Sequence, residues 1–539
     1  MTDFRTRQSR NGKSIRHQGA AVALLALVTG TSIGCSAPVR PAAPKLPPPP
    51  TGQAAVGEDF LDDLEKRSFL YFHDNVNRDN GLVPDRAPTP SFSSIAAVGF
   101  ALAAWPIGAE RGYISRQEAA DLTLAALRFF DEAKQGPERA GTSGYRGFFY
   151  HFLDMKTGAR FEKVELSTID TTLMLGGALF AQGYFDRQDP QEAEIRERAE
   201  SIYRKVEWPA MIARPPLVSM GWKPESGLLK YDWNGLNEAM LLYILALGSP
   251  SHPIDAAAWP AYFETAVWAD YYGYEHVNFG PLFVHQFSHA FVDFRGIRDE
   301  LGRRRGIDYF ENSRRATLAQ RAYAIDNPHG FEGYGAELWG LSASDGPVDA
   351  KISVHGKKVR FMTYSARGAA ANEVRDDGTL SPSALMGSIP FAPEVTLPSL
   401  AAMKARFGDH IYGRWGFYGA FNLTLEKSAK PDVKLYHGKR VPGVGWFDTD
   451  VLGIDQGASL LMIENYRSEL IWKVLRQNPH IRRGLERAGF RGGWLEQPAG
   501  APAAETISEM PWAAAPLPYQ LPSREPALAG SAAAEVLRP

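Results

Sequence analysis

Cysteine is nearly absent from this sequence, because Cys35 is the only one among 539 residues. A single cysteine cannot form an internal disulfide, so a disulfide-stabilised fold is excluded and this thiol needs another role. An excess of charge of one sign is missing too, since the net charge is -2. A near-neutral chain gives no electrostatic reason to expect nucleic acid or another polyanion as a partner. A small neutral or weakly charged ligand fits this composition better.

Phosphate-binding motifs are also missing. No Gly-rich loop of either standard spacing occurs, and no alternation of strands with helices suggests a doubly wound sheet. The sequence therefore gives no indication of a nucleotide-binding α/β enzyme.

The first 35 residues have the pattern of an export signal. Several Arg and Lys residues precede an apolar run over 20–28, which is shorter than the roughly 20 residues that span a bilayer. The segment ends in Ser32-Ile33-Gly34-Cys35, which resembles a bacterial lipobox without its usual leucine. We predict a lipoprotein signal peptide over 1–35, with lipid on Cys35, and Ser36 favours the outer membrane on the periplasmic side. The alternative is an ordinary cleaved signal that contains a cysteine.

Composition divides the remaining chain into three parts. Residues 36–57 form a Pro-rich linker that includes the polyproline run over 38–50 and cannot join a core. Residues 58–495 have the mixed composition of a folded body, and 496–539 turn to Ala and Pro. We expect one monomeric folded domain between a linker and a tail, with membrane contact through the N-terminal lipid only.

Hydrophobic spacing in the body predicts mainly helices. Fully apolar segments alternate with amphipathic ones, and the second segment is expected to stop at Pro106. Such alternation suggests an inner ring of buried helices covered by an outer ring, which is an all-α fold of the α/α toroid type. An α-helical solenoid is the alternative, but no fixed repeat supports it. Some strand is expected around 351–364. The expected helices cover 61–72, 94–105, 116–130, 167–185, 191–206 and 236–247.

Four loops combine Gly, aromatic and acidic residues: 144–150, 231–235, 333–339 and 446–450. In a toroid such loops meet at one mouth. Aromatic rings stack on sugar faces while carboxylates bind hydroxyl groups, so the loops predict a polysaccharide cleft. The alternative is that they are ordinary packed turns.

Acids at the starts of apolar helices are the candidate catalytic groups. Glycosidic hydrolysis needs one protonated carboxyl group and a second carboxylate. Asp170, Glu238 and Asp455 each introduce a strongly apolar segment. Asp170 with Ser167 also fits a capping box, and Asp455 could cap its helix. Glu238 is expected past the first turn of a buried helix, where burial would raise its pKa and suit a proton donor. Further candidates are Glu337, Asp345, Asp448, Asp450 and Glu464.

A histidine pair at helical spacing, His285 and His289, raises the question of zinc. The glutamate that acts as base in zinc hydrolases is replaced here by Gln286. Hydrogen bonding to substrate or to carboxylates is therefore the preferred role, with Asp293 and Arg295 nearby in sequence.

Six long segments together resemble the bacterial glucoamylase-like family, which overlaps glycoside hydrolase family 144. The resemblance covers about residues 60–480 and rests on the segments 93–116, 165–179, 231–253, 280–299, 333–347 and 453–468.

The resemblance implies an (α/α)6 barrel and hydrolysis of β-1,2-glucan to short sophoro-oligosaccharides, with inversion and without a cofactor. Glu238 would protonate the glycosidic oxygen, while Asp455 or Asp170 activates water. The groups expected to position the glucan are Tyr231, Trp233, Asn237, His285, His289, Arg295, Glu337, Trp339 and Asp345.

Two other functions remain open at this point. A polysaccharide lyase would also use a helical toroid with aromatic loops, but it needs a Tyr or His base and favours a basic cleft. A non-catalytic glycan-binding lipoprotein would bind glucan without releasing reducing ends.

Overall fold

The computed structural model describes residues 57–429 and 433–497. The predicted signal peptide with Cys35, nearly all of the linker and most of the tail lie outside the described residues, and their assignment stays a prediction. Within the described ranges, no helix combines the length and apolar character needed to cross a membrane.

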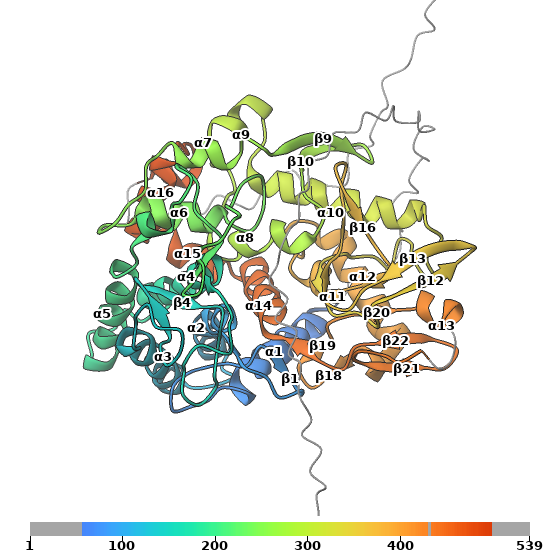
Figure 1. Ribbon diagram of the computed structural model, residues 1–539, viewed down its shortest axis with the longest axis horizontal. Helices are drawn as coiled ribbons and strands as arrows, with labels where there is room; N and C mark the ends of the chain where they lie inside the picture. Colours follow the sequence, from blue (N-terminus) through green and yellow to red (C-terminus); the bar gives the residue numbers. More distant parts are fainter. Residues whose placement is uncertain (1–56, 430–432, 498–539) are drawn as a thin grey trace, which may run out of the picture. The chain divides into compact units, whose positions relative to one another are not determined.

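Three buried helices, α2 (Ile95–Glu110), α4 (Thr168–Tyr184) and α14 (Gly453–Arg467), contribute to one large hydrophobic core. Almost every side chain of α2 is buried, as expected for a helix that is apolar on all sides. α2 packs against α4 and α14, and Figure 1 shows α14 beside α2. The contact with α4 is close because Gly99 and Gly177 face each other: a Cβ on Gly177 would lie 1.8 Å from the carbonyl oxygen of Gly99.

Amphipathic helices cover these buried helices. α1 (Glu58–Asp74) packs on α2 and α14, α3 (Arg116–Glu132) packs on α2, and α5 (Pro190–Arg204) packs on α3 and α4. Apolar α6 (Met240–Gly248) packs on α4 and is covered by α16 (Pro479–Arg487). The predicted layering of buried and amphipathic helices is therefore present in this part of the fold.

A second hydrophobic core lies between α10 (Tyr309–Asp326), α11 (Pro382–Met386) and α12 (Pro393–Phe407), and α11 contacts α14. The shorter α-helices are α7 (Ala258–Tyr262), α8 (Phe287–Phe291), α9 (Glu300–Arg305), α13 (Thr424–Ser428) and α15 (Leu470–Leu475). The 3-10 turns are η1 (Trp208–Met211), η2 (Leu282–His285), η3 (Gly408–His410) and η4 (Gly493–Glu496).

The strands are short and pair antiparallel. One sheet has the order β3-β4-β6-β7-β8 and a second has the order β17-β20-β22-β21. The first comprises β3 (Gly144–Tyr145), β4 (Phe148–Tyr150), β6 (Leu166–Ser167), β7 (Gly221–Lys223) and β8 (Gly227–Leu228). The second comprises β17 (Thr379–Leu380), β20 (Phe421–Asn422), β22 (Gly445–Phe447) and β21 (Lys439–Val441).

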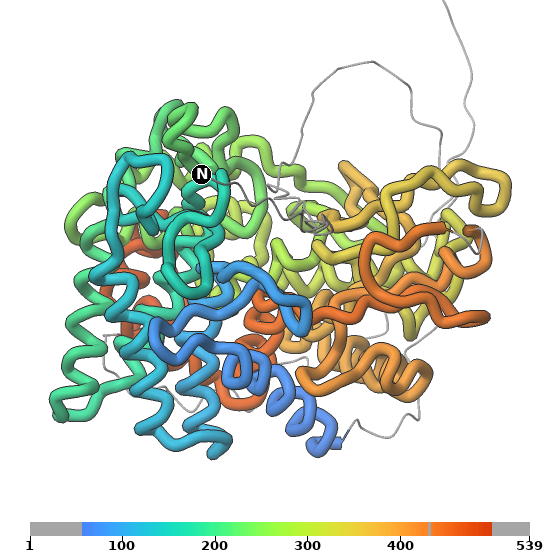
Figure 2. The backbone as a smooth tube through the Cα atoms, turned by 60° about the horizontal axis from the view of Figure 1, so that its bottom comes forward, coloured from blue at the N-terminus to red at the C-terminus, as the bar shows by residue number. Residues whose placement is uncertain are grey.

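Seven two-stranded pairs connect the remaining segments. The pairing of β1 with β23 brings the blue N-terminal part of the chain beside its orange C-terminal part (Figure 2). The pairs are β1 (Arg86–Ala87) with β23 (Val451–Leu452), β2 (Ser93–Ser94) with β5 (Phe152–Leu153), β9 (Val267–Tyr271) with β10 (Tyr274–Asn278), β11 (Ala343–Ser344) with β14 (Ser365–Ala366), β12 (Ala350–Val354) with β13 (Lys357–Phe361), β15 (Gly368–Ala369) with β16 (Val374–Arg375), and β18 (Tyr412–Gly413) with β19 (Gly416–Phe417).

The predicted helices are present, with two corrections. Pro106 does not end its helix, because α2 continues to Glu110 with the proline inside it. The helix expected from residue 236 begins at Met240, since the preceding residues form turns. The strand expected over 351–364 is present as the hairpin β12–β13.

Candidate active site

Two of the predicted acids occupy the same position on buried helices. A two-residue strand leads directly into each helix, β6 into α4 and β23 into α14. Asp170 and Asp455 are each the third residue of their helix, and both are buried. The paired strand directly before each helix therefore fixes the position of the buried acid in the first turn of that helix.

Glu238 lies in the turn before α6, and not past the first turn of a helix as the sequence suggested. Its backbone is anchored, because the hydroxyl of Ser288 donates to the carbonyl oxygen of Glu238 at 2.9 Å. Burial raises the pKa of the Glu238 carboxyl group to about 7, and the charge of Asp170 adds to this effect. Glu238 therefore holds its proton up to about neutral pH.

Asp170 is held by its own helix cap. The hydroxyl of Ser167 accepts from the backbone N–H of Asp170 at 3.2 Å and donates to its carboxylate. The predicted capping role is thus confirmed, but it does not isolate the carboxylate, since Nε2 of His151 lies 3.6 Å from Oδ2. Asp170 is at once a capping partner and a neighbour of Glu238.

His151 links Asp170 to further acids. Its Nδ1 lies 2.9 Å from Oε1 of Glu165. Burial favours the neutral ring, but the charges of Asp170, Glu165 and Asp85 outweigh this effect and raise the pKa of His151 to about 9. The ring is therefore an imidazolium at neutral pH.

Asp455 belongs to a second group of acids. Burial raises the pKa of its carboxyl group to about 8, and the charges of Asp345, Asp85 and Asp448 add to this effect. Leu452 is the N-cap of α14 and the cap makes no side-chain hydrogen bond, so Asp455 is not the cap that the sequence allowed. Its Oδ2 accepts no hydrogen bond from the described residues. This oxygen is buried, and its hydrogen-bonding capacity is not used by the described residues.

Two cations balance this second group. Nη1 of Arg86 lies 2.6 Å from Oδ2 of Asp345 and 3.8 Å from Oδ2 of Asp450. Nε2 of His437 lies 3.0 Å from Oδ1 of Asp448 and 3.2 Å from Oδ2 of Asp450. The two carboxylates raise the pKa of His437 to about 10, so this ring is charged as well.

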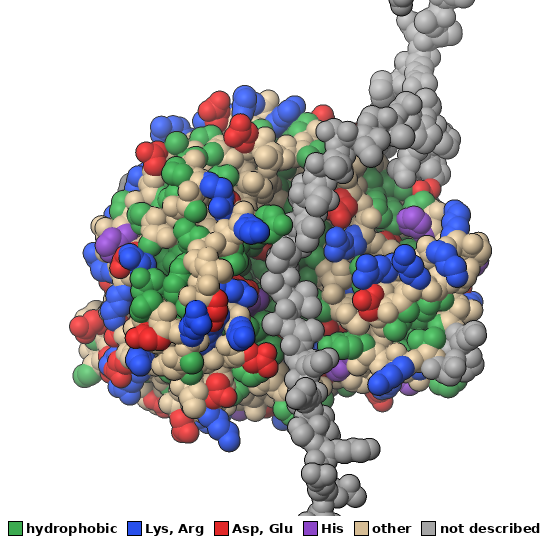
Figure 3. All heavy atoms as spheres, in the orientation of Figure 1, with side chains coloured by type: hydrophobic (Ala, Val, Ile, Leu, Met, Phe, Trp, Pro, Cys, Tyr) green, Lys and Arg blue, Asp and Glu red, His purple; other side chains and the backbone are tan. Residues whose placement is uncertain are grey.

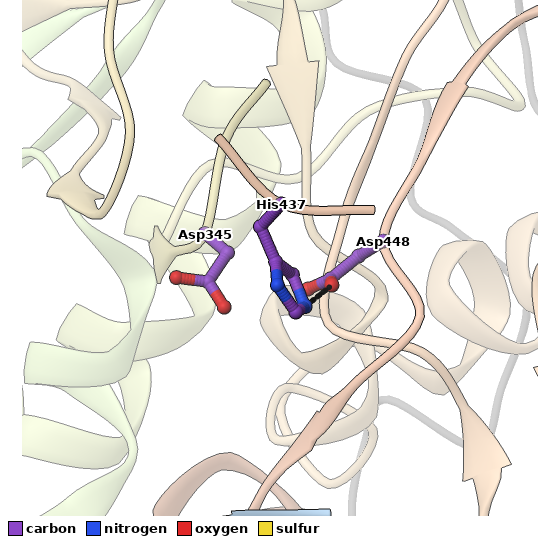
Figure 4. A group of neighbouring side chains, drawn as sticks. All are labelled: Asp345, His437 and Asp448. Atoms are coloured by element: carbon purple, nitrogen blue, oxygen red, sulfur yellow. Dashed lines mark ion pairs between the residues drawn. The ribbon is translucent and has the colours of Figure 1, made fainter. Parts of the chain in front are cut away.

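Asp345, His437 and Asp448 are also the described residues best placed to hold a metal ion. One ligand atom from each lies within 4.8 Å of the others. Figure 4 shows His437 between the two aspartates, in an ion pair with Asp448. Arg86 pairs with Asp345 and the His437 imidazolium pairs with Asp448, while Oδ2 of Asp448 accepts no hydrogen bond from the described residues.

The predicted histidine pair does not form a ligand site. His285 ends η2 and His289 lies in α8, so they are not on one continuous helix. Both rings are buried, and burial lowers the pKa of each to about 3. His289 contacts the hydroxyl of Ser313 and the aromatic rings around it. These neutral histidines belong to the core, which corrects their expected role in positioning glucan.

Three other predicted contacts are core groups too. Trp339 is fully buried in the second core, and its indole N–H donates to Ser399 at 2.8 Å. The indole of Trp233 donates to Thr168 at 2.9 Å, and Asn237 is bonded to the hydroxyl of Tyr262. Trp339 is 0% exposed and offers no open face to a sugar ring, whereas Trp233 is 5% exposed, about as much as Glu238.

The remaining predicted residues lie outside the two acid groups. Arg295 is fully engaged with Asp293 and Glu469, so it is part of a structural ion-pair network. Glu337 is exposed. Tyr231 is 38% exposed, which makes it the predicted aromatic residue that is free to stack on a ligand. Glu464 pairs with Arg111 at the outer end of α14 and does not join the candidate site.

Sequence reasoning missed Asp85, Arg86, His151 and His437. Local pattern gives no signal for them, since none begins an apolar helix. Only the pairing of distant segments, β1 with β23 and β2 with β5, brings the first three to Asp455 and Asp170.

The fold has a helix-rich core, and two of its buried helices carry a carboxyl group in their first turn. Comparison with known proteins identifies the family. A family model described as "Putative glucoamylase" matches residues 230–479. The structure of a protein of the same description from Bacteroides uniformis has a TM-score of 0.69 with 30% identity, covering 83% of this chain and all of that one. The chain therefore belongs to the glucoamylase-like family that the sequence resemblance indicated.

Two relatives carry names that describe an activity. An endo-β-1,2-glucanase from Chitinophaga pinensis, solved with sophorotriose and glucose, is 26% identical with a TM-score of 0.68, covering 82% of this chain and all of that one. The exo β-1,2-glucooligosaccharide sophorohydrolase (non-reducing end) of Parabacteroides distasonis is 26% identical over 465 residues. The match covers 80% of this chain but only 58% of the length of the Parabacteroides protein.

Proposed function

We propose that this protein is a glycoside hydrolase that cleaves β-1,2-glucan to sophoro-oligosaccharides. The observation that carries the proposal is a buried glutamic acid, Glu238, with a pKa of about 7, in a chain whose relatives are named as hydrolases of this glucan. The near-neutral surface also fits an uncharged glucan. On the face shown in Figure 3, basic and acidic side chains are interspersed over most of the surface.

Glu238 is the proton donor in this proposal. A carboxyl group that keeps its proton at neutral pH can transfer it to the oxygen of the glycosidic bond as the bond breaks. The Ser288 hydroxyl fixes the Glu238 backbone, which limits the positions that the carboxyl group can take. Burial keeps the proton on Glu238, and the nearby negative charge of Asp170 adds to this effect because it disfavours a second carboxylate.

Asp455 is the favoured base that activates water. Its Oδ2 has no hydrogen-bond partner among the described residues, whereas the carboxylate of Asp170 is already engaged by Ser167 and faces His151. A base must be ionised, and Asp455 reaches that state near its pKa of about 8. In this proposal the attacking water lies between Asp455 and the anomeric carbon, so the reaction inverts the configuration at that carbon.

The test is incubation of the purified protein with linear and cyclic β-1,2-glucan, with laminarin, starch and cellulose as controls. Chromatography should show short oligosaccharides from the β-1,2-glucans alone. Cleavage of the cyclic form would establish endo action, and proton NMR of the first products would give their anomeric form. An ultraviolet-absorbing unsaturated product would indicate a lyase, and binding without any product would refute the hydrolase proposal.

The finer architecture and the cellular location belong to the same proposal. The buried and amphipathic helices, together with the family match, support an (α/α)6 toroid. The lipobox-like segment supports lipidation of Cys35 and anchoring to the outer membrane in the periplasm. Metabolic labelling with radioactive palmitate should label the full chain, and the Cys35→Ala variant should remain unlabelled and leave the membrane fraction.

A further inference from the structure

A buried arginine, Arg367, donates hydrogen bonds to the backbone at Asp345, a member of the second acid group. Arg367 and Asp377 form an ion pair in which both side chains have 0% exposure. The pair is bidentate, because Nε of Arg367 donates to Oδ1 of Asp377 at 2.8 Å and Nη2 donates to Oδ2 at 2.9 Å. A buried ion pair is weak evidence for stability, since losing hydration offsets much of the attraction. The pair therefore calls for another explanation.

The other guanidinium hydrogens bind two loop segments. Nη1 donates to the carbonyl oxygen of Ser344 at 2.9 Å and to that of Asp345 at 3.4 Å. Nη2 donates to the carbonyl oxygens of Met362 at 2.8 Å and Thr363 at 3.1 Å. One planar group thus ties the backbone at Asp345 to the backbone that leads into Tyr364.

Both of these segments end in the acid group around Asp455. Asp345 pairs with Arg86, and its charge raises the pKa of Asp455. Burial and the charges of Asp455, Asp85 and Asp345 raise the pKa of Tyr364, which places its hydroxyl among these carboxyl groups. Burial is the largest cause of the raised pKa of Asp455, and the charge of Asp345 adds to it, so the position of Asp345 affects the protonation of Asp455.

The backbone at Gly346 lies so close to the guanidinium group of Arg367 that it leaves no room for a side chain. A Cβ on Gly346 would lie 2.2 Å from Nη2 of Arg367. Asp377 is fixed independently, because its carboxylate also accepts the backbone N–H groups of Met362 and Thr379. Neither partner can move without moving the loop that carries Asp345.

We infer that Arg367 and Asp377 are positioning residues of the active site, which fix the backbone at Asp345 and thereby the carboxylate that pairs with Arg86 in the second acid group. This inference rests on the proposed function for the role of Asp455. Lysine cannot replace the planar guanidinium group of Arg367, because one ammonium group cannot bind a carboxylate and four carbonyl oxygens in a plane.

The test uses the full chain with Arg367→Lys and Gly346→Ala, and Arg116→Lys is the matched control. Arg116 makes the same bidentate pair with Glu192, between the outer helices α3 and α5. A displacement of about 1 Å can cost a catalytic site on the order of 100-fold. We expect kcat to fall by roughly 10- to 100-fold in both test variants. Their pH optimum should move to lower pH, because Asp455 loses the charge that raises its pKa, and the control should keep both values.

Repeating Arg367→Lys in the Asp345→Asn variant distinguishes a positioning role of Arg367 from a general loss of structure. Arg367→Lys should add no further shift of the pH optimum there, because the charge that it positions is already gone. An equal shift in both backgrounds would overturn the inference.

A readout that needs no activity separates this inference from the proposed function. The pH dependence of the Tm difference between each protein and its Asp455→Asn derivative reports the pKa of Asp455. If β-1,2-glucan is not hydrolysed, the proposed function fails while this titration still decides the positioning role. An unchanged titration of Asp455 in both Arg367→Lys and Gly346→Ala would refute it, and Gly346→Ala alone decides if Arg367→Lys does not fold.

Discussion

Nη1 of Arg86 lies 2.6 Å from Oδ2 of Asp345, although 259 positions separate the two residues in the sequence. The contact depends on the pairing of β1 with β23, which places Arg86 opposite Leu452 at the entrance to α14. Arg86 is thus brought to the helix that carries Asp455. A single cation from the N-terminal part of the chain neutralises acids from its C-terminal part.

Removing this cation should destabilise the protein. In Arg86→Met, the carboxylate of Asp345 would remain buried without its nearest positive charge, and breaking such a pair costs about 3 kcal/mol. The free energy of unfolding, measured in urea, should fall accordingly. Arg360→Met is the control, because Arg360 and its partner Asp349 are 65% and 59% exposed and such pairs contribute at most about 1 kcal/mol. Equal losses in the two variants would contradict burial of the Arg86 pair.

Replacing the proton donor should abolish turnover and keep binding. Glu238→Gln preserves size and removes the proton, so kcat on β-1,2-glucan should fall by about 100- to 10,000-fold. Affinity for sophoro-oligosaccharides, measured by calorimetry, should change little. Glu197→Gln on the exposed face of α5 is the control and should behave as the wild type. Full activity of Glu238→Gln would remove Glu238 from the mechanism.

Activity should be highest between about pH 7 and pH 8. Glu238 must be protonated and Asp455 ionised; because their pKa values are about 7 and about 8, this combination is a minority state whose population is largest midway between the two values. Rates measured across pH should therefore give a bell-shaped profile. In Asp345→Asn the pKa of Asp455 falls because one neighbouring charge is lost, and the optimum should move toward lower pH. An optimum that does not move would show that Asp345 does not control the base.

The sequence could predict the helices that carry the site but not the contacts that complete it. α2 and α4 are predictable because their apolar residues surround the whole helix, and the acid that follows Ser167 marks a helix start. The role of Trp339 could not be predicted, because an aromatic residue in a Gly-rich loop has the same local sequence whether it faces a ligand or the core. His437 could not be found because only tertiary structure brings it to Asp448 and Asp450. Local pattern predicts the start of a helix, and long-range pairing decides its neighbours.

A buried carboxyl pair outside the candidate site gives a separate test, based on stability. Burial raises the pKa of Glu65 to about 8, and the neighbouring Glu464 adds to this effect, while Arg111 and Arg467 oppose it. The pKa of Glu65 in the folded state lies above its ordinary value of 4.5. The stability associated with the protonated group is therefore full below about pH 4.5 and is lost as pH rises toward 8.

In Glu65→Gln this loss cannot occur, because the amide does not ionise. The variant should gain stability relative to the wild type between pH 5 and pH 8, by on the order of 3 kcal/mol over the range. Thermal unfolding of both proteins at several pH values gives the difference directly. Glu192→Gln is the matched control: pairing with Arg116 lowers the pKa of Glu192 against the opposing effect of burial, so its difference from the wild type should change only below about pH 4.5. If the Glu65→Gln difference stays constant from pH 5 to pH 8, Glu65 is ionised in the folded protein throughout that range and the ion pairs with Arg111 and Arg467 outweigh its burial.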